Sequence, residues 1–216
     1  MVRTAQAAEE LLADAFAQQY RYTFGHPGWT ANCRFRDDSG EADAMVAMTS
    51  AADVKVMPND ALTGTKHELL QQDLRSLART LFGFDYRQGE GKFPKTLNEE
   101  PHPLGPMVVL HDDPHEATFR VRQRRVTMAT RRQGSLLETV RVDRWHIRPD
   151  GRWLPAQWVA EVWDDAVVGP LVSARYWDLF WPFGGELVPQ LRRVDVTDDL
   201  GITVGRAMTL AEWHLG

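Results

Sequence analysis

The sequence has a single cysteine, Cys33, and this scarcity excludes two kinds of site. One thiol cannot form a disulfide within the chain, and it cannot supply a metal site built from several thiolates. A lone cysteine is more often a small buried apolar residue than a nucleophile. We therefore expect Cys33 to lie in the core, and we expect no metal site of this kind.

Long apolar runs and familiar catalytic motifs are also missing. No stretch approaches the roughly 18 apolar residues that a membrane-spanning helix needs, so we expect no membrane span. Residues 1–4 and the Ala, Gln and Glu after them hold no apolar stretch typical of a signal peptide, which predicts a cytoplasmic protein. The chain has no glycine-rich phosphate loop, no HExxH or GxSxG motif and no internal repeat, so we expect no cofactor.

Charge is distributed unevenly along the 216 residues. The formal net charge is −5, yet residues 119–152 contain ten Arg and three acidic residues, a local charge of +7. The rest of the chain therefore carries −12. An acidic protein without aromatic residues at base-stacking spacing is not expected to bind nucleic acid, so the basic region needs another explanation.

Hydrophobic periodicity predicts two helices followed mainly by strands. Residues 4–20 and 66–82 have apolar residues at helical spacing. The face of the first helix comprises Ala8, Leu11, Leu12, Ala15 and Phe16, and that of the second comprises Leu70, Leu74, Leu77, Ala78 and Leu81. Residues 84–106 show no period and are expected to form an irregular loop. About eleven strands are predicted, at 29–36, 41–49, 52–57, 107–111, 117–123, 126–131, 136–147, 153–163, 171–180, 187–196 and 202–213. Strands that follow one another without helices predict an α+β fold in which one large, curved antiparallel sheet wraps over both helices.

Short motifs at both ends resemble a family of uncharacterised proteins abundant in cyanobacteria, domain of unknown function 3386. The similar segments are 19–23 (QYRYT), 27–31 (PGWTA), 187–189 (LVP), 192–193 (RR) and 208–215 (MTLAEWHL). The resemblance implies a half-open antiparallel barrel over helices, the architecture of the periplasmic lipoprotein carriers and of a violacein-pathway enzyme that shapes an indole intermediate. It provides no catalytic residues that can be assigned to this sequence. It leaves the function open, because one fold hosts unrelated functions.

The basic region places arginines at alternate positions of predicted strands. Arg120 and Arg122 share one face of their strand, opposite Phe119, and Arg141 alternates with valines on another strand. If these three arginines face the concave side of the sheet, they form a cluster suited to bidentate capture of a carboxylate or phosphate. If they face outward, they belong to a solvated sheet surface.

Tryptophan is abundant, with eight residues, six of them between Trp145 and Trp181. Such rings usually belong to the core, but they can also form the wall of a pocket for a flat apolar ligand. The candidate wall comprises Trp158, Trp163, Trp177 and Phe180.

Histidines and carboxylates suggest two further sites. His102, His111 and His115 lie near several acids, but Pro114 makes 111–116 a turn, so a metal site there stays an open alternative. His146 is the candidate general base, with Glu161 nearby if their strands pair; a structural histidine is the alternative.

These observations lead to one function and one alternative for a single half-barrel domain over residues 1–216. The function is the binding of a small apolar or aromatic molecule with an anionic group in the concave face. The alternative is a cofactor-independent enzyme, similar to a lyase or isomerase, in which His146 or Glu161 moves a proton in the same pocket. The sequence leaves open whether a reaction is catalysed, and it leaves a homodimer open.

Overall fold

A computed structural model describes residues 2–23, 25–59, 62, 64–83 and 85–216. Within this part of the chain the helices are α1 (Val2–Gln18) and α2 (Gly64–Phe82), with one 3₁₀ turn, η1 (Glu90–Lys92). None of these helices is long and apolar enough to cross a membrane. The strands are β1 (Trp29–Asp37), β2 (Gly40–Met48), β3 (Val54–Pro58), β4 (Lys95–Asn98), β5 (Met107–Leu110), β6 (Thr118–Arg122), β7 (Arg125–Gln133), β8 (Leu136–Ile147), β9 (Trp153–Asp164), β10 (Pro170–Phe183), β11 (Glu186–Asp198) and β12 (Thr203–Leu215).

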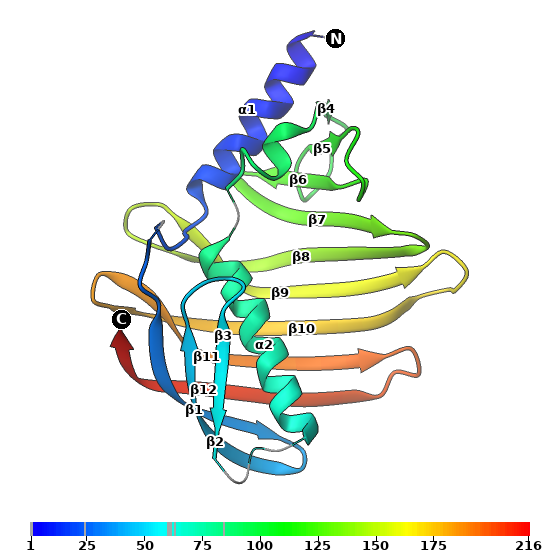
Figure 1. Cartoon of the computed structure of the whole chain (residues 1–216). Coiled ribbons are helices and arrows are strands. Elements are labelled where there is room, and N and C mark those ends of the chain that lie inside the picture. Colours follow the sequence, from blue (N-terminus) through cyan, green and yellow to red (C-terminus); the bar gives the residue numbers. More distant parts are fainter. Residues whose placement is uncertain (1, 24, 60–61, 63, 84) are drawn as a thin grey trace. The chain divides into compact units, whose positions relative to one another are not determined.

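The strands form one open antiparallel sheet in the order β3-β2-β1-β12-β11-β10-β9-β8-β7-β6-β5-β4 (Figure 1). Neighbours in this order are also consecutive in the chain, except that β12 pairs with β1. Short connections favour this arrangement, because a tight turn joins antiparallel strands and a parallel pair needs a long crossover. The predicted α+β class with one large antiparallel sheet is confirmed.

The described sheet has twelve strands, one more than predicted, and the additional strand lies in the stretch expected to be irregular. β4 occupies four residues within 84–106 and pairs with β5, Lys95 lying opposite Leu110. Four residues are too few for a hydrophobic period, so only the pairing with β5 reveals the strand. The first helix also ends earlier than predicted, at Gln18, because the backbone N–H of Tyr20 donates to the carbonyl of Trp153 at 2.7 Å.

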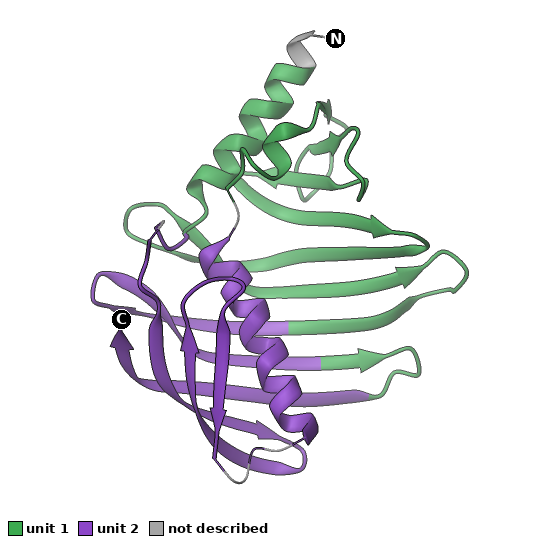
Figure 2. Cartoon of the chain, in the orientation of Figure 1, with its two compact units in different colours: residues 1–20, 84–175, 196–202 green, residues 21–83, 176–195, 203–216 purple. Residues whose placement is uncertain are grey.

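The chain packs as two compact units (Figure 2). Unit 1 comprises Met1–Tyr20, Phe84–Arg175 and Val196–Ile202, and unit 2 comprises Arg21–Gly83, Tyr176–Asp195 and Thr203–Gly216. Helix α1 belongs to unit 1 and α2 to unit 2. The single half-barrel domain over residues 1–216 stays a prediction.

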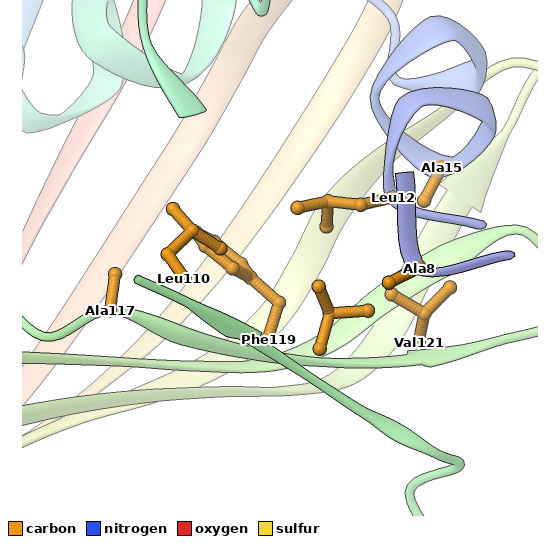
Figure 3. Packing of buried hydrophobic residues seen from close by; sticks show 8 residues of the cluster. Ala8, Leu12, Ala15, Leu110, Ala117, Phe119 and Val121 are labelled. Atoms are coloured by element: carbon orange, nitrogen blue, oxygen red, sulfur yellow. The ribbon is translucent and has the colours of Figure 1, made fainter. Parts of the chain in front are cut away.

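The core of unit 1 forms where α1 packs on β5 and β6 (Figure 3). Three predicted core residues of the helix, Ala8, Leu12 and Ala15, are fully buried, and Leu11 and Phe16 pack at the edge of the cluster. Their partners from the sheet are Val108, Leu110, Ala117, Phe119 and Val121. The apolar face predicted for this helix is confirmed.

A buried lysine explains why β4 lies beside α1 in unit 1. The ammonium group of Lys95 is 2.6 Å from the Glu9 carboxylate and donates to the carbonyl of Phe93 at 2.7 Å. Glu9 also accepts a hydrogen bond from the Tyr86 hydroxyl at 3.0 Å. The pKa of Tyr86 is raised, mainly by burial and also by this hydrogen bond. One glutamate of α1 thus anchors both the loop and β4, because a buried ammonium group needs such a partner.

The core of unit 2 forms between α2 and the buried faces of β1, β2 and β12. All five residues predicted for the apolar face of α2 are fully buried: Leu70, Leu74, Leu77, Ala78 and Leu81. Phe35, Val46 and Met208 contribute from the strands. Side chains alternate along a strand, so the residues between them point to the opposite side. We call that side, turned away from α2, the outer face of unit 2.

Candidate functional site

A groove of about 690 Å³ lies on the outer face of unit 2. Its lining residues come from β3, β2, β1 and β12, which are neighbours in the sheet (Figure 1). Its position follows from the alternation in β1, where Ala31, Cys33 and Phe35 are buried while Asn32 and Arg34 are exposed. The groove therefore belongs to the face that α2 leaves uncovered. Its volume is within the range of small-molecule pockets, roughly 300–1,000 Å³.

Two methionines provide the apolar part of the groove. Met45 on β2 and Met57 on β3 are direct cross-strand partners, and Asn32 on β1 is the next residue in the same row. Met45 is 47% and Met57 39% exposed, which is high for large apolar side chains placed side by side. Methionine is flexible and polarizable, so such a pair adapts to ligands of different shape.

The polar groups of the groove are paired with one another. Arg34 donates to Asp43 at 3.0 Å, and this hydrogen bond raises the pKa of Arg34. Asn32 donates to Glu212 at 2.5 Å. Glu212 has a positive φ of 54° and lies at a register shift, where Thr30 and Asn32 of β1 face His214 and Ala211 of β12. This bulge turns the Glu212 carboxylate toward the groove, a common use of bulges near binding sites.

Cys33 lies behind the groove and does not offer a nucleophile. The residue is 2% exposed, as the sequence predicts. Burial, and then the charge of Asp43, raise the pKa of the thiol to about 12. The thiolate, which is the reactive form, is therefore scarce at neutral pH.

Two buried ion pairs hold α2 against the strands of unit 2. Asp178 of β10 accepts two hydrogen bonds from Arg192 of β11, at 2.6 and 2.8 Å, and Asp73 of α2 accepts two from Arg206 of β12, at 2.6 and 2.7 Å. Arg192 also donates to the backbone carbonyl of Asp73 at 2.9 Å. Burial alone would lower the pKa values of Arg192 and Arg206. The carboxylates of Asp178 and Asp73 have the larger effect, so both pKa values are raised. We call these four residues the ionic anchor.

The ionic anchor was not predicted from the sequence, although one signal was available. Asp73 interrupts the apolar face of α2 between Leu70 and Leu77, and an acidic residue at such a position needs a buried cation. Arg192 and Arg206 are candidates for that cation. Each lies two positions before an apolar residue of its strand, and residues two positions apart share one face of a strand.

The arginines predicted to clamp an anion lie on the face of unit 1 turned away from α1. Phe119 and Val121 point to α1, so Arg120 and Arg122 point to the other side of β6. Arg120 donates to the carbonyl of Gly105 at 3.0 Å and Arg122 to that of Pro103 at 2.8 Å. Arg141 is paired with Asp143 at 3.0 Å. Two of these arginines thus hold the loop before β5, and the third forms an exposed ion pair. Anion binding by the three arginines stays a prediction.

The four aromatic residues predicted as one wall are not brought to one surface. Trp158 and Trp163 lie on opposite faces of β9, in unit 1, because Trp163 is five positions after Trp158 and the register between them is regular. Trp177 and Phe180 lie on opposite faces of β10, in unit 2. Phe180 is 3% exposed and belongs to the core, whereas Trp177 lies under the guanidinium of Arg193 at 5.3 Å. Strand alternation therefore prevents a shared wall.

The predicted catalytic pair is not assembled. β8 and β9 do pair, but His146 lies opposite Leu154 while Glu161 lies opposite Thr139. Glu161 lies seven positions after Leu154 on β9, a distance of about 23 Å along the strand. Burial, and then the charge of Arg148, lower the pKa of His146.

The histidine-rich turn is held by ordinary loop contacts. Thr96 and His111 are hydrogen-bonded at 2.9 Å, His102 accepts from the backbone N–H of Leu104 at 3.1 Å, and Asp113 accepts from that of Ala117 at 2.9 Å. Among the described residues, no group of three or more His, Cys, Asp or Glu is placed to hold a metal ion.

A protein-family model described as protein of unknown function (DUF3386) matches residues 3–212. The chain belongs to this family. The resemblance carried by the motifs at both ends is thereby confirmed. No curated protein matches the chain.

Solved structures with a similar course of the chain come from bacteria. A LolA superfamily protein from Nitrosomonas europaea is 15% identical, with a TM-score of 0.39 over 99% of this chain and 94% of that one. A putative outer membrane lipoprotein-sorting protein domain from Vibrio parahaemolyticus is 9% identical, with a TM-score of 0.36 over 98% and 93%.

Proposed function

We propose that the protein binds a small apolar or aromatic molecule in the groove on the outer face of unit 2. The observation that carries the proposal is the pair Met45 and Met57, two exposed cross-strand partners in a groove of about 690 Å³. Ligand pockets are mostly apolar and carry a few polar groups that fix orientation. Asn32 and Glu212 are such groups, because their side chains have capacity for further hydrogen bonds beyond the one they share.

The proposal moves the binding site away from the face predicted by the sequence. In unit 1 that face is filled by α1, and in unit 2 by the leucines of α2. The outer face of unit 2 has no such cover in the described part of the chain, so its groove is accessible to a ligand. The enzyme alternative gains no support, since His146 and Glu161 are about 23 Å apart along their strands.

Displacement of the neutral fluorophore 1-aminoanthracene tests the proposal. We expect the probe to bind the native protein and decanol to displace it. The double variant Met45→Ser/Met57→Ser should bind about thirtyfold more weakly. Each methionine is roughly half exposed, so covering it stabilises the complex by about 1 kcal/mol, and two together by about 2 kcal/mol.

Leu200→Ser is the matched control. Leu200 is 79% exposed in the turn between β11 and β12 and belongs to unit 1, so the same kind of change is made outside the groove. This variant should bind the probe as the native protein does. Equal binding by the double methionine variant would contradict the proposed groove.

A further inference from the structure

A second hollow, of about 630 Å³, lies in unit 2 where β1 and β12 approach the turn between β1 and β2. It is adjacent to the methionine groove on the same strand, because Arg34 lines the groove and Arg36, two residues further along β1, lines the hollow. Both side chains point to the outer face. We call this second feature the arginine hollow.

Two arginines face each other across one small residue in the arginine hollow. Arg36 of β1 is the cross-strand partner of Ala207 on β12. The other sheet neighbour of β12 is β11. Gly205 of β12 lies beside Asp195 of β11, since a β-carbon added to Gly205 would be 3.2 Å from Asp195 Oδ1. Since β11 and β12 are antiparallel neighbours, Arg193 lies beside Ala207. Arg36, Ala207 and Arg193 thus form a row of about 10 Å across three strands, with space above the alanine.

The charges of the arginine hollow favour an anion. Arg36 makes no ion pair with any residue that the structure describes, although Glu41 lies opposite it on β2. Arg193 is bound to Asp195 at 3.1 Å and lies over the ring of Trp177, contacts that orient its guanidinium. Guanidinium groups bind carboxylate and phosphate oxygens through paired N–H donors.

The acidic residues lining the hollow are partly neutralised. Asp37 accepts hydrogen bonds from Ser39 and lies 3.5 Å from the ammonium group of Lys66. Burial alone would raise the pKa of Asp37, but the contacts with Ser39 and Lys66 have the larger combined effect and lower this pKa. Asp38 is exposed to solvent. Arg36 and Arg193 flank Ala207, and the carboxylate of Asp195 is already paired with Arg193.

We propose that the ligand of the methionine groove is an amphiphile whose oxyanion, a carboxylate or a phosphate monoester, is held by Arg36 and Arg193. This inference rests on the proposed function and adds the chemical class of the ligand. Along β2, Met45 lies four positions after Glu41, the partner of Arg36, a distance of about 14 Å. An extended apolar chain in the groove thus reaches the arginine hollow with its charged end.

Four probes separate the two parts of the site: decanol, decanoate, decyl phosphate and inorganic phosphate. The native protein should bind both charged amphiphiles about fivefold more tightly than decanol, and should not bind inorganic phosphate measurably. Arg36→Gln and Arg193→Gln should each weaken binding of the better charged amphiphile about threefold to fivefold and leave decanol unchanged. These effects match the modest gain that exposed charge pairs give. Arg75→Gln, an exposed position on α2, is the charge-matched control.

The outcomes distinguish failure of this inference from failure of the proposed function. If decanol and the charged amphiphiles bind equally, or if both arginine variants bind like the native protein, the arginine hollow does not hold the anion. Inorganic phosphate binding as tightly as decyl phosphate would also overturn the inference, since the anion site would then be independent of the groove. If none of the four probes binds, the proposed function falls and the inference falls with it.

Discussion

Asp178→Asn is expected to lower the free energy of unfolding by about 3 kcal/mol. In the native protein the side chains of Asp178 and Arg192 are both 0% exposed and joined by two hydrogen bonds. The substitution leaves the Arg192 guanidinium buried without its counter-charge, a change that costs about 3–5 kcal/mol. Asparagine keeps the shape and one acceptor, and Arg192 keeps its bond to the carbonyl of Asp73, so the lower value applies.

The expected loss is large enough to measure and small enough for the protein to fold. Domains are stable by about 5–15 kcal/mol, so the variant stays folded in buffer. For a chain of 216 residues, 3 kcal/mol corresponds to a Tm lowered by about 7 °C. Urea unfolding followed by tryptophan fluorescence and far-UV circular dichroism should show a lower midpoint with an unchanged slope.

Two further variants make the test specific. Asp143→Asn breaks the pair with Arg141, whose side chains are 43% and 47% exposed, and should cost less than about 1 kcal/mol. The double variant Asp178→Leu/Arg192→Met removes both partners of this pair and should be more stable than Asp178→Asn, because no unpaired charge is left buried. If Asp178→Asn costs no more than Asp143→Asn, the reasoning about the ionic anchor is refuted.

Two other predictions concern titratable groups. Because the pKa of Cys33 is about 12, a disulfide reagent at about pH 8 should modify it slowly in the native protein and rapidly in urea; equal rates would contradict its burial. The pKa of His146 in the folded protein is below its ordinary 6.5, so the unfolded chain binds more protons and stability should fall as the pH decreases below about 6.5. His146→Gln should reduce this loss of stability, measured as the difference between the urea midpoints at about pH 7.5 and pH 5. His111→Gln, a change at an exposed position, should leave the difference unchanged. Identical pH dependence in both variants would exclude His146 as the cause.

The candidate site shows where prediction from sequence ended. Met45 and Met57 fall in separate predicted strands, and neither has a predicted role. Their contact depends on the register of β2 against β3. Register is a property of the paired strands, and a shift of one residue would turn Met45 away from the outer face.

Local periodicity was sufficient for the parts of the fold that depend on one segment at a time. The apolar face of α2, from Leu70 to Leu81, could be predicted because a helix repeats every 3.6 residues regardless of its partners. Alternation in β6 likewise placed Arg120 and Arg122 on one face.

Tertiary structure decided which face is covered and which distant residues meet. Alternation cannot say that Phe119, and not Arg120, points to α1, because that depends on where the helix packs. The bulge at Glu212 and the ion pair between Asp73 and Arg206 join residues far apart in the chain. Such contacts depend on side chains that meet only after folding. The secondary structure and the buried faces of the helices therefore follow from local sequence. The groove, the arginine hollow and the ionic anchor follow from the register and packing of unit 2.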